Sequence, residues 1–320
     1  MPSPRTLRAL CLAIAILLLA VSPIWSWGRD GHRIVARIAA RNLKPEARKK
    51  LAAILGTNDA GLENAMAAAS TWPDEINKSK TGTFDWHFVD IPVTEPFAVG
   101  SLCAKHDCII DRIEEMADRL RTNRGGFTLA ARPDPPRPGT SREVAFLIHF
   151  VGDIHQPLHG SDNSDRGGNC ENLQNPMIHA DGTRTTVLHG VWDVDEVLTV
   201  MRVLGDEQAT AAALFQRFKN GAQVPQATVL EWTRESNQLA RENIYQKLRI
   251  PKYTAPLGQC PVNVAKLAID QAYLDSNEKI VEERLLRAGI RLSNLLNEVC
   301  AGGGCQAGPN GSQMNADGRR

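Results

Sequence analysis

The stretch HFVGDIHQPLH, residues 149–159, contains three histidines and one aspartate. His149 and Asp153 are four residues apart, so in a helix both side chains project from one face, about one turn from each other. His159 follows a proline that should end the helix, and it can fold back from a loop toward the same region. His155 would face away from Asp153 and is not counted as a ligand. The spacing therefore predicts that this segment can hold a cation.

The same four-residue spacing recurs in LHGVWD, where it separates His189 from Asp193. A single pair of this kind is more often a surface salt bridge than a metal site. Two pairs, with His159 close to the first, favour the metal site, because buried carboxylates and imidazoles need partners. A borderline cation such as Zn²⁺ suits nitrogen and oxygen ligands.

Two upstream residues are further candidates. TWPDEI places Asp74 at the end of a predicted helix, and FDWHFVD places His87 among aromatic residues. Asp74 could instead cap the next helix, and His87 could be a hydrogen-bonded core histidine. When each residue is considered alone, the structural role is a better interpretation than the role of a metal ligand.

The elements that must position these residues are mostly helical by their apolar periodicity. Asp30 is expected to cap the first helix, Pro45 to begin the second, and Pro73 to end the third. The Gly- and Pro-rich residues 123–140 predict a surface loop, and residues 183–190 are one of few strand-like runs. The expected helices cover residues 31–43, 45–55, 63–72, 108–122, 141–155, 194–204, 207–218, 227–245 and 262–299. An all-α, single-domain helical bundle with a short β-hairpin follows, with residues 301–320 as a disordered tail.

The N-terminus has the pattern of a secretory signal. Arg5 and Arg8 precede an apolar run over residues 9–21, which is short for a membrane span, and Ser26 is a suitable residue before the cleavage site. Residues 1–26 would be removed, leaving Trp27 first; an uncleaved anchor is the alternative. The mature chain would carry 35 basic and 36 acidic side chains, so no strong basic field indicates a nucleic-acid or membrane surface.

Six cysteines would remain after cleavage, and an even number in an exported chain predicts three disulfides. Cys103 with Cys108 and Cys300 with Cys305 are plausible local pairs, and the full pairing stays open. A cysteine metal site is the weaker alternative, because no C-x-x-C pair is present. The remaining cysteines of the mature chain are Cys170 and Cys260.

Taken together, these motifs resemble the S1/P1 nuclease family, the zinc-dependent secreted single-strand nucleases. The resemblance covers nearly the whole mature chain, over residues 27–300. It rests on WGRDGHRIVARIA, WPD, WHFVD, HFVGDIHQPLH, DRGGN, LHGVWD, EWTRES and AGIRLSNLLN. It implies a helical fold of the phospholipase C/P1 nuclease type.

The resemblance further implies three zinc ions with assigned ligands. The first would be held by Asp74, His87, His149 and Asp153. The second would be held by Asp153, His32, and the α-amino group and carbonyl oxygen of Trp27. The third would be held by His159, His189 and Asp193. A free α-amine can lose its proton to a metal near neutral pH, whereas an internal amide is no ligand, so signal cleavage would complete the site.

The implied reaction is in-line hydrolysis of phosphodiester bonds in single-stranded DNA and RNA to 5'-phosphate products, with 3'-nucleotides as further substrates. Asp74 and Asp153 would be the catalytic carboxylates, Asp74 orienting the attacking water. Phe88 would stack on a nucleobase and Asp90 would hydrogen-bond to it, with Asn169 as a further substrate contact; ordinary core packing is the alternative for Phe88. A monomer that is secreted or periplasmic, with no protein partner, is expected.

Two departures from the family pattern stand out. The family commonly has an arginine three residues after the aspartate of WPD, where it contacts the phosphate, and this chain has Asn77. We expect activity to be retained, with Lys78 or Lys80 as possible substitutes for the charge. The segment between Cys170 and His189 also looks longer than the usual family hairpin.

Two alternative functions remain at this point. Zinc phospholipase C has a similar fold and an N-terminal Trp, but its second pair usually ends in Glu, whereas this chain has Asp193. Its first histidine also lies further from the terminal Trp than His32 does from Trp27. A non-catalytic zinc-binding protein would use the same ligands without an open coordination position.

Overall fold

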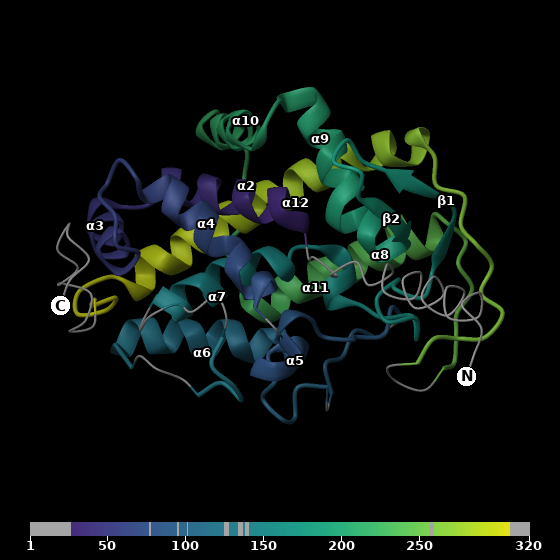
Figure 1. Cartoon of the computed structure of the whole chain (residues 1–320), viewed down its shortest axis with the longest axis horizontal. Coiled ribbons are helices and arrows are strands. Elements are labelled where there is room, and N and C mark those ends of the chain that lie inside the picture. The colour runs from purple at the N-terminus through teal and green to yellow at the C-terminus, as the bar shows by residue number, and fades with distance from the viewer. Residues whose placement is uncertain are drawn as a thin grey trace, which may run out of the picture.

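A computed structural model of the chain describes residues 27–307, apart from residues 77, 95, 101, 125–127, 134–136, 138–140 and 256–258. The expected signal segment, Asn77 and the tail beyond residue 307 lie outside the described residues. The fold is all-α with one small hairpin, as the sequence predicts (Figure 1). No helix among the described residues has the length and apolar character that a membrane span requires.

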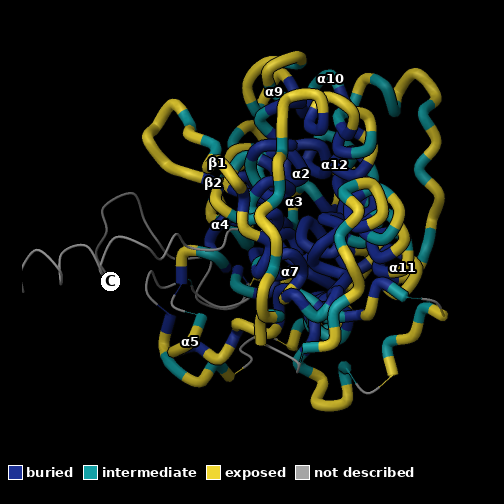
Figure 2. The backbone as a smooth tube through the Cα atoms, turned by 90° about the vertical axis from the view of Figure 1, so that its right-hand side faces the viewer, coloured by how far each residue is buried: buried dark blue, intermediate teal, exposed yellow. Residues whose placement is uncertain are grey.

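The centre of the bundle is α7, Ser141–Asp153, in which all described residues except Arg142 are buried. It packs against α4 (Leu62–Glu75), α6 (Ile109–Thr122), α2 (Gly28–Arg41) and α12 (Gln271–Val299). Figure 2 shows the buried interior where α2, α7 and α12 meet. A mostly apolar helix buried on every side fits the centre of a bundle, since it has no polar face to turn to water.

The remaining elements surround this centre, and several are short turns that carry site residues. The further helices are α3 (Pro45–Ile54), α5 (Lys78–Thr81), α8 (Leu188–Gly190), α9 (Glu196–Leu204), α10 (Glu207–Lys219) and α11 (Val229–Leu239). The 3₁₀ turns are η1 (Phe84–His87) and η2 (Pro157–Gly160), and the π-helical segments are η3 (Val191–Asp195) and η4 (Ala240–Gln246).

Residues 170–188 contain the hairpin, in which β1 (Asn172–Ile178) pairs antiparallel with β2 (Arg184–Val187). Its register places Asn172 opposite Val187 and Ile178 opposite Arg184, with an irregularity between them. The hairpin projects from the bundle and is largely exposed (Figure 2). Its second strand runs directly into α8 and η3, the segment that carries His189 and Asp193.

Three expected helix boundaries were wrong. Asp30 is not a cap, because α2 begins at Gly28 and the backbone N–H of Gly31 donates to the Trp27 carbonyl at 3.1 Å. Pro73 does not end α4, which continues to Glu75; near a helix end a proline removes only one backbone hydrogen bond. The last helix starts at Gln271, because Leu267 instead pairs with β1 through two backbone hydrogen bonds of 2.8 Å.

Three disulfides are present, as predicted. Cys103–Cys108 and Cys300–Cys305 close short local loops, and Cys170–Cys260 joins residues 90 apart in the sequence. Residues 301–307 lie against α6, where the Cys305 N–H donates to the Leu120 carbonyl at 2.8 Å.

Candidate metal centre

The first group of ligand atoms lies where α4, η1 and α7 meet. His87 Nδ1 lies 3.0 Å from His149 Nε2 and 3.1 Å from Asp153 Oδ2. Asp74 Oδ1 lies 3.5 Å from His149 Nε2 and 3.9 Å from His87 Nδ1. All four side chains are buried and converge on one point, as a tetrahedral site needs.

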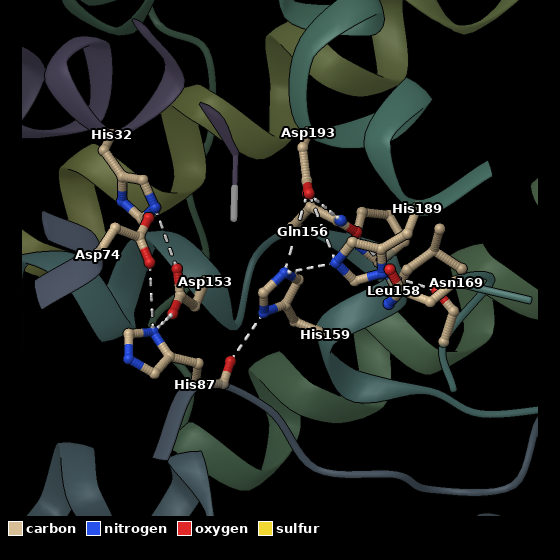
Figure 3. A network of polar contacts seen from close by, with 12 residues as sticks. His32, Asp74, His87, Asp153, Gln156, Leu158, His159, Asn169, His189 and Asp193 are labelled. Atoms are coloured by element: carbon tan, nitrogen blue, oxygen red, sulfur yellow. Dashed lines mark hydrogen bonds and ion pairs between the residues drawn. The ribbon is translucent and has the colours of Figure 1, made fainter. Parts of the chain in front are cut away.

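The second carboxylate oxygen of Asp153 faces a different partner. Asp153 Oδ1 lies 3.1 Å from Nε2 of His32, which projects from α2 (Figure 3). The His32 ring stacks on the His149 ring, with centroids 3.9 Å apart. Gly152 permits this approach, because a Cβ atom there would lie 2.7 Å from His32 Nδ1. Asp153 is therefore placed to bridge two cations.

The third group comes from η2, α8 and η3. His189 Nε2 lies 3.1 Å from His159 Nε2 and 3.5 Å from Asp193 Oδ2, and His159 Nε2 lies 3.8 Å from Asp193 Oδ1. All three side chains are buried, and their atoms lie close enough to share one ion. Figure 3 shows this group beside the Asp153 cluster but separate from it.

Backbone carbonyls orient three of the histidine rings. Nδ1 of His149, His159 and His189 each lies 2.7 Å from a carbonyl oxygen, belonging to Ser70, His87 and Gly167 respectively. An Nδ1–H that donates to a carbonyl leaves the Nε2 lone pair free, which is the usual arrangement around metal-binding histidines. The rings are therefore held in the tautomer that a metal requires.

The electrostatics of the centre favour a cation. Burial lowers the pKa of His87 and of His189 to about 3, so these rings stay neutral and can coordinate. At His149, burial is outweighed by the carboxylates of Asp153 and Asp74, which raise its pKa to about 10. Asp74 Oδ2 and His32 Nδ1 are buried without a hydrogen-bond partner among the described residues. This set of nitrogen and oxygen donors suits zinc.

The S1/P1 nuclease family profile matches residues 27–301, which include all of these ligand residues. The chain belongs to the S1/P1 nuclease family. It is 26% identical to Nuclease S1 of Aspergillus oryzae, over 92% of this chain and 98% of that protein. It is 25% identical to Nuclease P1 of Penicillium citrinum, over 85% and 97%. It is 26% identical to Endonuclease 1 of Arabidopsis thaliana, over 92% and 94%.

Membership in the S1/P1 nuclease family settles the reaction class. The protein is a hydrolase of phosphodiester bonds and a nuclease, and the phospholipase C alternative is not favoured. The family is zinc-dependent, in agreement with the several buried His and Asp groups of this chain.

Trp27 lies at the start of α2 and is completely buried. Its backbone forms a hydrogen bond with Asp193, which belongs to the third group. Gly28 next to it approaches the same segment closely, since a Cβ atom there would lie 2.8 Å from the Asp193 carbonyl oxygen. The residue expected at the mature N-terminus is thus packed into the metal centre of this S1/P1 nuclease.

The expected substrate residues lie around the centre rather than within it. Phe88 is half-buried and follows His87; its ring meets the Phe84 ring edge-to-face, with centroids 5.6 Å apart. Asp90 is half-buried, and burial together with Asp162 raises its pKa to about 7.

Asn169 is also half-buried and lies beside the third group in Figure 3, where its amide donates to the Arg166 carbonyl at 2.8 Å. Asn77 lies outside the described residues. Its neighbour Lys78 places Nζ 2.5 Å from Asp74 Oδ1.

One residue that contacts a ligand was missed in the sequence. The Gln156 amide donates to Asp193 Oδ1 at 2.7 Å, and its carbonyl oxygen accepts from the Leu158 N–H at 2.5 Å. Gln156 therefore connects the end of α7 to the third group. Its position between two histidines of HFVGDIHQPLH is the feature of the sequence that could have indicated this contact.

His155 points away from the metal ligands, as predicted. Its Nδ1 lies 2.8 Å from the Val151 carbonyl oxygen, and its Nε2 lies 3.0 Å from Arg291 Nη1. Arg291 and Arg284, both buried in α12, also bind Glu235 of α11, and Arg284 Nε donates to the His155 carbonyl at 2.9 Å. This network fixes the turn that follows α7.

Proposed function

We propose that this chain is an exported nuclease that uses three zinc ions to cleave single-stranded DNA and RNA to 5'-phosphate products. The observation that carries the proposal is the position of Asp153. One of its oxygens faces His32 and the other faces His87 and His149, beside a separate group of ligands (Figure 3). A bridging carboxylate beside a third site suits phosphodiester hydrolysis.

The ligand assignment follows the three groups. Asp74, His87, His149 and Asp153 would hold the first ion, and Asp153, His32 and the N-terminal amine and carbonyl oxygen of Trp27 would hold the second. His159, His189 and Asp193 would hold the third. Bound zinc ions would lower the pKa of water toward neutrality and neutralise charge on the phosphate.

The chain's own side chains would position the reactants. Asp74, with one oxygen free of hydrogen bonds among the described residues, would orient the attacking water. Lys78 lies beside Asp74, is only 18% exposed, and acts electrostatically on His87 of the first group and His189 of the third. We infer that it would donate to a phosphate oxygen and supply the charge that Asn77 lacks.

Substrate selection would depend on the residues next to His87. Phe88 would stack on a nucleobase and Asp90 would hydrogen-bond to it, with Asn169 at the opposite side. Stacking on one aromatic ring is worth about 1 to 3 kcal/mol and tolerates any base. Because the base must leave its duplex stack to reach Phe88, single strands would be preferred, and 3'-nucleotides are small enough to be substrates as well.

Export agrees with the three disulfides and with the packing of Trp27. We infer that a signal peptide over residues 1–26 is removed, so that the Trp27 amine becomes available, and that residues 27–300 form one nuclease domain; the first part of the expected disordered tail, residues 301–307, is instead ordered against α6. The mature protein would be a secreted or periplasmic monomer without a protein partner.

The test is hydrolysis of single-stranded DNA, single-stranded RNA and a 3'-nucleotide by zinc-loaded protein that starts at Trp27, with and without a chelator. We expect release of acid-soluble nucleotides and 5'-phosphate ends from the polymers, and loss of all activity with chelator. A matched control protein with one alanine added before Trp27 should retain less zinc and less activity. If correctly processed, zinc-loaded protein left all three substrates intact, the proposal would be wrong.

A further inference from the structure

The loop that connects η2 to β1 is folded around two buried carboxylates. Asp162 Oδ1 accepts from the N–H groups of Asp165 and Gly167, at 2.9 and 3.1 Å. Asp165 Oδ1 accepts from the Gly168 N–H at 3.0 Å and from the Tyr245 hydroxyl at 2.9 Å. One oxygen of each side chain is therefore committed to the loop.

Three other carboxylate oxygens in this region do not take part in the hydrogen bonds of the loop. Asp165 Oδ2 and both oxygens of Glu171 are buried, and none of them has a hydrogen bond of good geometry among the described residues, although the Tyr253 hydroxyl and the Asp165 carboxylate lie within reach of Glu171. Both residues are 0% exposed. Burying an ionised carboxylate without a partner costs several kcal/mol, so buried charges in native proteins are normally paired or bind a metal.

Among the described residues, these carboxylates lack a cationic partner. Neither Asp165 nor Glu171 forms an ion pair in the part of the chain that the structure describes, and Arg166, which follows Asp165 in the sequence, is exposed. Burial and mutual repulsion raise the pKa of Glu171 to about 7, and burial raises that of Asp165 to about 6. A shared proton would join only two of the three free oxygens, whereas a cation can contact all three.

We propose that Asp165 and Glu171 form a binding site for a calcium ion, separate from the His and Asp centre. The available donors are all oxygens, from the two carboxylates and from the hydroxyl of Tyr253, which lies near Glu171. Oxygen donors select hard cations rather than zinc. Ca²⁺ accepts irregular oxygen shells, whereas Mg²⁺ demands octahedral geometry and keeps several waters, which a fully buried pair does not accommodate.

A cation bound at this site would stabilise the loop that orients His189, a ligand residue of the metal centre. The Gly167 carbonyl, in this loop, is the hydrogen-bond partner of His189 Nδ1 at 2.7 Å. The Glu171 carbonyl accepts from the Leu188 N–H at 2.9 Å, next to His189. Holding Asp165 to Glu171 would therefore fix both backbone contacts of the segment that enters the third group.

The test uses the full mature protein, loaded with zinc so that the His and Asp centre is occupied. Terbium replaces calcium at oxygen sites, and Tyr245 and Tyr253 are close enough to transfer excitation to it. We expect tyrosine-sensitised terbium emission that calcium displaces and magnesium does not. Calcium at about 1 mM should also raise the thermal midpoint by about 2 to 4 °C.

The variant Glu171→Gln removes one charge without changing the shape of the side chain. It should lose both the emission and the calcium response, whereas Glu114→Gln, at an exposed glutamate of α6, should keep both. Wild-type protein that gives no sensitised emission and no calcium response would overturn the proposal. So would a Glu171→Gln protein that is more stable than wild type without calcium dependence, since this is the result expected of a shared proton.

Discussion

Asp153 contributes one carboxylate oxygen to each of two neighbouring groups of ligands. Its two oxygens face different histidines, since Oδ1 lies 3.1 Å from His32 Nε2 and Oδ2 lies 3.1 Å from His87 Nδ1. Loss of this side chain should therefore affect two ions, whereas loss of His159 should affect one.

We predict that Asp153→Ala lowers zinc content by two ions per chain and kcat/KM by about a thousandfold or more, because both bridged ions lose a ligand. His159→Ala should lower zinc content by one ion and retain more activity. Zinc per chain, measured by mass spectrometry on folded protein, and cleavage of single-stranded DNA check this. Equal losses in the two variants would contradict the bridging role.

Asp90 should select bases according to its protonation state. Its pKa, raised to about 7 by burial and then by Asp162, makes it a neutral acid at lower pH and a carboxylate at higher pH. A neutral carboxyl donates and accepts, which suits the N1 and N6 edge of adenine. A carboxylate only accepts, which suits the two N–H donors of guanine.

The measurable quantity is the ratio of kcat/KM for the dinucleotides ApA and GpG. We predict that this ratio falls about tenfold between about pH 5.5 and about pH 8.5, and that Asp90→Asn keeps it constant, because an amide always donates and accepts. The ratio cancels the pH dependence of the chemical step. A wild-type ratio that does not change with pH would rule out this role of Asp90.

At the scale of elements, the close approach of α2 to α7 sets the position of His32. A Cβ atom at Gly152 would lie 2.7 Å from His32 Nδ1, so Gly152→Ala should displace the ring from Asp153. We expect reduced zinc content, a destabilisation of about 1 to 3 kcal/mol, and lower activity. Gly303→Ala, where a Cβ atom meets nothing within 4 Å, is the matched control in denaturation and zinc assays. Unchanged zinc content in Gly152→Ala would show that His32 does not depend on this contact.

Helical spacing was sufficient to predict that the His149 and Asp153 side chains lie together, because both residues belong to one continuous helix. The pair His189 and Asp193 was predicted on the same spacing, but these residues span the junction of α8 with a π-helical turn. Their convergence depends on that turn, which residue periodicity does not reveal. The contact of His32 with Asp153 depends on how α2 packs on α7, and was expected only from the family resemblance.

Local sequence patterns were also insufficient to predict the structure in the second half of the chain. Residues 262–270 have an apolar pattern that predicts helix, yet Leu267 pairs with β1 instead. Arg284 and Arg291 look like surface residues of an amphipathic helix, but both are buried where they bind Glu235. In each case a partner distant in the sequence decides the outcome, and local propensity does not contain that information.

For the whole molecule, the buried metal centre should contribute to stability as well as to catalysis. We predict that removing metal with a chelator lowers the thermal midpoint by on the order of 5 to 10 °C, because a ligand that binds only the folded state stabilises it. Adding zinc should restore the midpoint and magnesium should not, since the ligands are nitrogen and oxygen donors. A midpoint unaffected by chelation, in protein shown to have lost its zinc, would contradict this prediction.

The near-neutral net charge should also show in substrate binding. Lys78 lies beside the metal ligands, and the formal net charge of the chain is only +1. Few counterions are then released on binding, so the affinity for single strands should depend only modestly on salt, in contrast to a basic DNA-binding domain.

The bridge between Cys170 and Cys260 has a consequence for the cell that makes this enzyme. It closes a ring that contains His189 and Asp193, and a link across 90 residues removes about 4 to 5 kcal/mol of chain entropy from the unfolded state. A copy retained in a reducing cytosol lacks this stabilisation in the very segment that carries the third ligand group. Under the proposed export, this segment would become fully stable only in an oxidising compartment, so nuclease activity on the producing cell's own RNA would stay low.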